Sequence, residues 1–253
     1  MTVRLSTALR NNLAGPTGFG ATFANGIIEI RTGSQPGTAD SAATGTLLGT
    51  VTLASGAFTA ETAGSQTITV SGSAGSVDTV TVGSVNIIPL GAVSFDTDTT
   101  VTAAALRDAI IRAGIYRATS SGAVVTVLAP VGTGDAHNGL ALATTVTTLT
   151  ATSGGNITGG VNAANGLKFA APASGAVSKS GTWSFVGVAA GTAGWFRLKA
   201  AITDAGGADS TFVYPRLDGS VATSGADMNL SNITITVSAP TTVDSFTYTQ
   251  PAS

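Results

Sequence analysis

Residues 66–72 read Gln-Thr-Ile-Thr-Val-Ser-Gly, and residues 77–83 read Val-Asp-Thr-Val-Thr-Val-Gly. In each stretch small polar residues alternate with branched apolar residues, which is the period-two pattern of a strand with one buried face. A short segment of Ser, Ala and Gly separates the two stretches. The pattern predicts a β-hairpin, and residues 85–90 predict a third strand.

One internal helix is predicted after these strands. Residues 101–113 contain neither Gly nor Pro. Asp98, Thr99 or Thr100 can cap the start of the helix, and Gly114 can end it. The apolar residues of this segment recur at helical spacing and predict one buried face: Leu106, Ala109, Ile110 and Ala113.

Residues 63–164 form a self-contained unit within a longer β-rich chain. Removing them would join residues 55–59 to residues 166–169 without breaking a predicted strand, and insertions are best tolerated at such exposed turns. The sequence therefore predicts a mainly β fold, in which a β-sandwich host domain is interrupted by a small α+β domain. The host comprises residues 1–62 plus 165–253, and the inserted domain, residues 63–164, is expected to project outward.

Further short strands are predicted in both parts of the chain. In the inserted domain they lie at residues 115–120, 123–129, 140–144, 146–151 and 156–161. In the host they lie at residues 26–32, 47–53, 183–188, 194–201, 211–217, 233–237 and 245–249.

The composition excludes several classes of protein. The chain has 253 residues, of which 9% are charged, against about 25% in an average soluble domain. Without Cys there is no disulfide framework or thiolate metal site, and one His cannot form a multi-histidine site. A net charge of -2 argues against nucleic-acid binding. No apolar run is long enough for a membrane span, and the N-terminus lacks the apolar core of a signal peptide.

The flanks resemble a family of short virion-associated proteins of tailed bacteriophages. The stretches that carry this resemblance are residues 1–11, 28–36, 44–48, 191–197, 217–221, 227–230 and 243–251. The inserted part is similar to a module that recurs in phage tail and other virion proteins, through residues 77–82, 104–110, 116–127, 138–142 and 159–161. The resemblance implies a virion structural protein and supplies no catalytic residues.

Residues 3–14 predict a short amphipathic helix, because Leu5, Leu9 and Leu13 recur every four residues. The Gly15-Pro16 pair ends it. This helix either caps the end of the sandwich or docks as an arm on a neighbouring subunit. Arg outnumbers Lys in the flanks, and its planar donor fork suits subunit contacts. The residues expected at such an interface are Arg4, Leu5, Leu9, Arg10, Arg31, Arg197 and Arg216.

Two polar groups raise the question of a chemical site. Asp96 and Asp98 are a close acidic pair, but calcium needs six to eight oxygen ligands, so a helix N-terminus is the favoured interpretation. His137 lies in a Gly- and Asn-containing turn, and no serine occupies the strand–turn–helix elbow that a catalytic triad needs. We interpret His137 as a polar turn residue.

Aromatic side chains offer a further alternative. Trp183, Trp195, Phe196, Tyr214 and Tyr248 could form a sugar-stacking platform, with Trp183 and Trp195 as the glycan-stacking candidates. A buried Trp is the commoner outcome. Burial decides between the two interpretations, because a stacking ring must be exposed.

The sequence predicts no catalytic, cofactor-binding or metal-ligating residue. A glycan depolymerase would need two positioned carboxylates, and Glu occurs only as Glu29 and Glu61, in a predicted strand and turn.

We therefore expect a non-enzymatic structural component of a tailed-phage particle, in the first place a capsid decoration or cement protein that acts through repeated subunit contacts. The alternatives are a tail or baseplate component and a receptor- or glycan-binding module. The expected partners are other virion proteins, with the major capsid protein favoured over tail proteins, and further copies in a homo-oligomer. Neither nucleic acid nor membrane is expected as a partner, and the expected location is the virion, after synthesis in the host cytoplasm.

Overall fold

A computed structural model describes residues 3–15 and 17–250 of the chain. The fold is mainly β, with 42% strand and 11% helix. The chain divides into two compact units, which we call the barrel unit (Met1–Glu61 with Ala163–Ser253) and the inserted unit (Thr62–Asn162). These boundaries lie within two residues of the junctions expected from the sequence. Among the described residues, no helix is long and apolar enough to cross a membrane.

The barrel unit contains two short helices and most of the strands. Its helices are α1 (Thr7–Ala14) and α2 (Phe19–Thr22). Its strands are β1 (Arg4–Leu5), β2 (Ile27–Thr32), β3 (Leu47–Leu53), β12 (Lys168–Phe169), β13 (Ala176–Ser180), β14 (Trp183–Val186), β15 (Gly191–Lys199), β16 (Arg216–Ala222), β17 (Met228–Leu230), β18 (Thr234–Ile235) and β19 (Pro240–Thr249).

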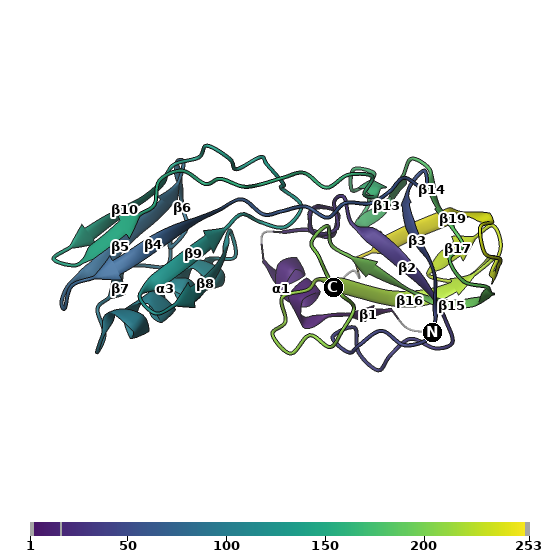
Figure 1. The fold of residues 1–253 in the computed structure, drawn as a ribbon, viewed down its shortest axis with the longest axis horizontal. Helices are drawn as coiled ribbons and strands as arrows, with labels where there is room; N and C mark the ends of the chain where they lie inside the picture. Colours follow the sequence, from purple (N-terminus) through teal and green to yellow (C-terminus); the bar gives the residue numbers. More distant parts are fainter. Residues whose placement is uncertain (1–2, 16, 251–253) are drawn as a thin grey trace. The chain divides into compact units, whose positions relative to one another are not determined.

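Seven of these strands form a closed ring (Figure 1). Their order is β16, β15, β2, β3, β14, β19 and β17, and β17 pairs with β16 to close the ring. The pair of β16 and β17 is parallel, and the other pairs of the ring are antiparallel. The expectation of a two-sheet sandwich is therefore not confirmed. Alternating apolar residues are common to sandwiches and barrels, so this pattern does not reveal the closure that β17 provides.

The interior of the barrel is filled by large apolar side chains. Ile28, Phe185, Phe196 and Leu198 are fully buried. Gly49 lies beneath Phe185, where an added Cβ would be only 2.1 Å from the ring. A larger residue at this position would displace the ring, which explains the glycine within strand β3.

Two predicted elements of the barrel unit differ in the structure, and α2, β12, β13 and β17 were not predicted. The predicted helix 3–14 is divided into β1 and α1, because Ser6 caps the helix and its Oγ accepts a hydrogen bond from the Leu9 N–H at 3.2 Å. Pro16, expected to end this helix, lies outside the described residues. The strand predicted at 211–217 begins only at Arg216. Asp209 holds the preceding residues as a loop, since its carboxylate accepts the N–H groups of Thr211 and Tyr214.

The inserted unit has two four-stranded sheets and one long helix. Strands β10 (Leu142–Thr147), β5 (Ser76–Val82) and β6 (Val85–Asn86) form one sheet, in which β7 (Val93–Ser94) also pairs with β5. Strands β11 (Thr150–Ser153), β4 (Ser65–Ser71), β9 (Val124–Leu128) and β8 (Arg117–Ser121) form the other. The helix is α3 (Thr99–Ala113).

The strands predicted on either side of residues 73–76 are present, but they do not form a hairpin. Strand β4 pairs with β9 and β11, whereas β5 pairs with β10, β6 and β7. The chain therefore passes from one sheet to the other between Ser71 and Ser76. Alternation identifies a strand and its buried face, but it does not identify the partner strand. No strand forms at 156–161, where the structure has isolated bridges.

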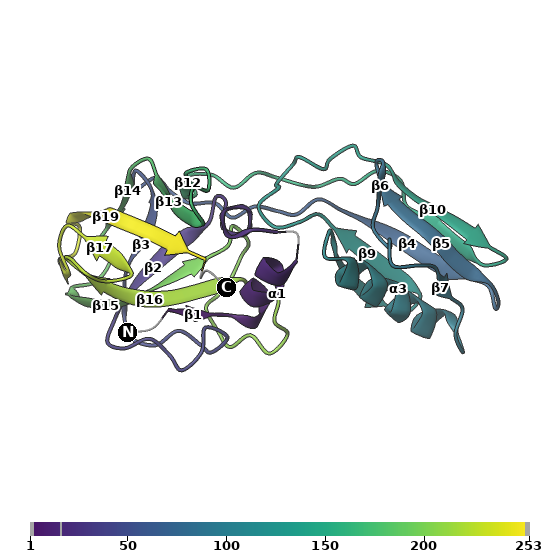
Figure 2. The same cartoon turned by 180° about the vertical axis from the view of Figure 1, so that it is seen from behind.

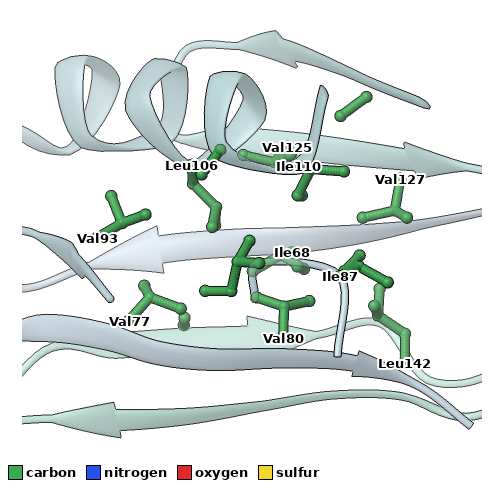
Figure 3. Close-up of a cluster of buried hydrophobic side chains, with 14 of the residues drawn as sticks. Ile68, Val77, Val80, Ile87, Val93, Leu106, Ile110, Val125, Val127 and Leu142 are labelled. Carbon is green, nitrogen blue, oxygen red and sulfur yellow. The ribbon is translucent and has the colours of Figure 1, made fainter. Parts of the chain in front are cut away.

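Helix α3 agrees closely with its prediction. Asp98 is the N-cap and accepts hydrogen bonds from the N–H groups of Thr100 and Val101 at 2.7 and 2.9 Å. Gly114 ends the helix in the left-handed conformation, with φ of 71°. Figure 3 shows Leu106 and Ile110 directed from the helix toward a core that includes Ile68 and Val125. The helix and the two sheets thus share one apolar core.

Candidate interaction surface

Several charged side chains of the barrel unit are buried within its fold. Arg197 on β15 faces Asp218 on β16 across the sheet. Two hydrogen bonds of 2.8 Å join the guanidinium to the carboxylate, and both side chains are fully buried. The same guanidinium donates to the Ser41 carbonyl and lies 5.5 Å from the ring centre of Trp195. This pair therefore fixes the loop containing Ser41 against the outer face of the barrel.

A second set of ion pairs lies on the same strands. Arg216 donates two hydrogen bonds to Asp204, at 2.6 and 2.7 Å, and a third to the Gly207 carbonyl. Lys199 pairs with Glu29 and donates to the Asp204 carbonyl at 2.9 Å. These contacts hold the loop between β15 and β16 over the sheet. Lys199 and Arg216 therefore stabilise the fold and place no positive charge at the surface.

The aspartates that pair with Arg216 and Arg197 have opposite pKa shifts. Burial tends to raise the pKa of Asp204, but the hydrogen bonds from Arg216 and the Gly206 N–H and the charge of Lys199 lower it further than burial raises it. The pKa of Asp218 is raised because burial outweighs the stabilising contact with Arg197. The ionised form of Asp204 therefore stabilises the folded state. Ionisation of Asp218 costs desolvation free energy that its contact with Arg197 offsets only in part.

Three of the seven predicted interface residues do not lie at the surface. Arg197, Arg216 and Leu9 are 0%, 1% and 0% exposed. The interface prediction is wrong for these three, because ion pairs and apolar packing within the chain bury them.

The remaining interface candidates are spread over the barrel unit. Arg31 pairs with Glu29 at 2.9 Å, and Arg4 donates to the Pro36 carbonyl. Arg10 is exposed on α1 and donates to the Thr7 hydroxyl at 2.8 Å. Leu5 lines the groove described below. Of the seven candidates, only Leu5 and Arg10 are at least partly exposed and neither form an ion pair nor donate to a main-chain carbonyl.

Both tryptophans are fully buried, which overturns the glycan-stacking alternative for them. Trp183 and Trp195 are each 0% exposed. Trp183 donates its ring N–H to the Ser180 carbonyl at 3.0 Å and packs edge-on against Phe169. A sugar cannot stack on rings that contact only the protein interior.

An open groove interrupts the wall of the barrel where β17 ends. Strand β17 lies between β16 and β19 (Figure 2) and bridges them only through Val221–Ala222 and Val243–Phe246, so it does not extend along the remaining parts of these strands. The groove between them has a volume of about 400 Å³. We call it the seam, and its lining residues are Val3, Leu5, Phe196, Leu217, Asp227, Phe246, Thr247, Tyr248 and Thr249.

The two sides of the seam are the edges of strands β1 and β19. Strand β19 pairs with β13 through Thr247–Thr249 on its far side, and β1 pairs with β16 through Arg4 and Leu5. Within residues 3–15 and 17–250, no second strand pairs with β1, nor with Thr247–Thr249 on the seam side. The lining of the seam therefore combines apolar side chains with the edges of two strands.

The remaining sequence candidates have structural roles. Asp98 caps α3, and Asp96 lies in the turn before it. His137 Nδ1 is 2.6 Å from the Tyr116 hydroxyl, and burial lowers the pKa of His137. Within the part of the chain that the structure describes, no three His, Asp or Glu residues cluster in a way that could hold a metal ion.

Comparison with known proteins adds no relative. No family model, curated protein or solved structure matches the chain. The function must therefore be inferred from the residues and geometry of the chain.

The seam was not predicted from the sequence. The alternation of Phe246 and Tyr248 with Thr247 and Thr249 predicts a strand with one aromatic face and one polar face. Alternation does not show whether both edges of that strand are paired, so it could not predict the groove.

Proposed function

We propose that this protein is a non-enzymatic structural component of a tailed-phage particle, acting as a capsid decoration or cement protein. The observation that carries the proposal is the seam, an apolar groove bounded by free strand edges. A fold that leaves such a groove open is suited to association with another polypeptide. The resemblance of most of residues 1–60 and 167–253 to phage virion proteins supplies the kind of particle.

The distribution of charge supports the same proposal. Arg197, Lys199 and Arg216 are buried within the barrel unit and contribute little charge to its surface. The surface that remains is rich in Thr, Ser and Ala, which permits close approach of neighbouring subunits without desolvation of many charges. Repeated copies on a symmetric particle would then add many weak contacts.

The inserted unit is the second part of the proposal. Residues 63–164 act as an insertion at the turn between β3 and β12, and the barrel unit acts as the anchoring part. We expect particle binding to depend on the barrel unit, and a homo-oligomer to contribute further contacts. A tail or baseplate position is the alternative, and the experiment below distinguishes it from a capsid position.

Capsids and tails are separated from one particle preparation, and any bound copies of this protein are removed from both. The purified protein is then added to the capsids and, in a second sample, to the tails. Electron microscopy then locates added density. Regular density on the capsid lattice is the expected result, and density on tails alone would move the protein to the tail or baseplate. Binding to neither structure would contradict the proposed function.

A further inference from the structure

Strand β8 lies at the edge of its four-stranded sheet, so only one of its two sides is paired. We propose that the other side pairs with β8 of a second copy of the chain, which joins two inserted units through one continuous sheet. This inference rests on the proposed function, which includes a homo-oligomer, and it assigns the surface through which two copies associate.

The hydrogen bonds of β9 show which main-chain groups of β8 are free. The Val70 N–H donates to the Ala123 carbonyl at 2.9 Å, so the residue that precedes β9 directs its main chain to β4. Successive residues of an antiparallel strand direct their main chains to opposite sides, so Thr126 faces β8, where it is paired with Thr119. It follows that two residues of β8 direct their N–H and C=O groups away from β9, namely Ala118 and Ser120.

The free side of β8 is not occupied by another part of the described chain. Among residues 3–15 and 17–250, no second strand pairs with β8, and no hydrogen bond engages the main-chain groups of Ala118 or Ser120. Arg117, the charged residue of the strand, donates its guanidinium to the Ala129 carbonyl at 3.1 Å. The edge therefore offers the main-chain groups of two residues that have no partner among the described residues.

The other sheet edges of the inserted unit carry features that hinder pairing with a second chain. Strand β10 has a register shift between Thr145 and Val146, and β6 and β7 contain only two residues each. On β11, the Ala151 carbonyl already accepts a hydrogen bond from the Thr144 hydroxyl. Bulges and very short strands are common protections of sheet edges. Strand β8 instead pairs with β9 in an unbroken register over five residues and contains no Pro, so its edge is the best suited to a second strand.

The partner that fits this edge is an identical strand. Two copies of β8 related by a two-fold axis perpendicular to the sheet run antiparallel, which is the more stable orientation of paired strands. When all residues of Arg117–Ser121 overlap, Ala118 of each copy pairs with Ser120 of the other and exchanges both N–H···O bonds with it. Thr119 then faces Thr119 of the second copy, and opposed threonines are a favourable cross-strand pair. The free groups of one copy thus satisfy those of the other.

Helix α3 extends the surface beside this edge (Figure 1). The Arg107 Nη1 donates to the Ser120 Oγ at 3.2 Å, so the side of α3 that carries Arg107 lies next to β8. Ile111 is one turn further along the same side of the helix and is 50% exposed. The two helices of the joined sheet lie on the same face of it, so Ile111 of each copy is directed toward the second helix. Pairing of β8 therefore also covers an apolar side chain.

The charges beside the edge are balanced within each copy. Arg107 Nη2 lies 2.7 Å from Asp108 Oδ1, and the two side chains are 33% and 56% exposed. The two-fold axis brings this pair of one copy toward the same pair of the other, so positive and negative groups are present on both sides of the contact. This charge complementarity favours a second copy of the chain over a partner whose surface carries one sign of charge.

The first test is a disulfide between two copies, because the chain contains no Cys. Thr119→Cys places a thiol opposite the same thiol of the second copy, at a Cα–Cα distance of about 4.5 Å, which a disulfide can span. Thr69→Cys is the matched control, since Thr69 is exposed on the same face of the sheet but lies on β4, which is paired on both sides. Under mild oxidation Thr119→Cys should form at least tenfold more covalent dimer than Thr69→Cys on a non-reducing gel. Equal amounts would overturn the inference.

A charge variant tests the same contact without oxidation. Thr119→Lys opposes two positive charges across the axis, so the dissociation constant of its dimer, measured by sedimentation, should be at least tenfold larger than that of wild type. An equimolar mixture with Thr119→Glu should recover the dimer, because each Lys then faces a Glu, and Thr69→Lys should associate as wild type does. A monomeric wild type, or a Thr119→Lys variant that associates as strongly as wild type, would overturn the inference.

The inference and the proposed function fail in different experiments. A wild-type chain that binds capsids but forms no dimer through Thr119 would overturn the β8 contact and leave the proposed function intact. A chain that dimerises through Thr119 but binds neither capsids nor tails would contradict the proposed function and support the β8 contact.

Discussion

The barrel unit and the inserted unit differ in what each buries besides its apolar core. Residues 62–162 are all described, and Thr102 is the only buried polar side chain among them. The barrel unit instead buries Arg197, Arg216 and Asp218, with loops held over them. Both units therefore have an apolar core that alternation can indicate, but the barrel unit also depends on individual buried ion pairs that alternation does not reveal.

The largest expected effect comes from breaking an ion pair of the barrel unit. Asp218→Ala leaves the Arg197 guanidinium buried without its carboxylate, and such a change typically costs about 3–5 kcal/mol. We expect a loss of that size in urea unfolding followed by tryptophan fluorescence. Both tryptophans belong to the barrel unit, so the signal reports that unit.

The control for this prediction is an exposed ion pair in the inserted unit. Asp108 pairs with Arg107 at 2.7 Å, and its side chain is 56% exposed. Asp108→Ala should change the unfolding free energy of the inserted unit, measured by native-state hydrogen exchange of residues 62–162, by less than about 1 kcal/mol. Equal losses in unfolding free energy for Asp218→Ala and Asp108→Ala would contradict the distinction between the two interiors.

The next effect concerns the apolar core of the inserted unit. Leu106→Ala removes a fully buried side chain of α3 and should cost about 3 kcal/mol, since a cavity adds to the lost burial. Native-state hydrogen exchange of residues 62–162 measures the loss. Leu106→Met, which nearly conserves volume, should cost less than about 1.5 kcal/mol. A similar loss for both substitutions would argue against a closely packed core.

Acid should weaken the barrel unit through Asp204. The carboxyl has a lowered pKa in the folded state, so its stabilising contribution is complete above the ordinary Asp pKa of about 3.9 and is lost as the pH falls below it. The stability difference between wild type and Asp204→Asn should therefore shrink from pH 6 to pH 3. Urea unfolding at each pH measures this difference, and a constant difference would contradict the prediction.

The smallest effect is expected from the single histidine of the inserted unit. Burial lowers the pKa of His137, so the unfolded state binds its proton more readily. Stability should consequently decrease as the pH falls through about 6.5, and His137→Gln should lose this dependence. Hydrogen exchange of residues 62–162 between pH 7.5 and 5.5, corrected for intrinsic rates, provides the measurement. An identical pH dependence in His137→Gln would exclude this role.

The inserted unit was the more predictable of the two. The cap at Asp98, the helix through Ala113 and its end at Gly114 follow from local chemistry that the structure reproduces. The pairing of β4 and β5 did not follow, because alternation leaves the partner strand unspecified. Local signals therefore predicted the elements, and long-range pairing decided their arrangement.

The barrel unit was predictable in its strands but not in its candidate site. Arg197 and Lys199 alternate with Phe196 and Leu198, a pattern typical of a strand with a solvent-exposed polar face. The structure buries that polar face beneath loops, so an interface prediction from Arg content failed. The seam depends on where β17 ends, and only the three-dimensional pairing shows it.

The central claim is that the protein attaches to its particle through the seam. Hydrogen exchange with mass spectrometry, on the protein free and bound to capsids, tests it most directly. The account predicts slower exchange on binding at the amides of Val3, Leu5 and Thr249, which line the seam. Protection confined to other surfaces, with these three amides unchanged, would contradict it.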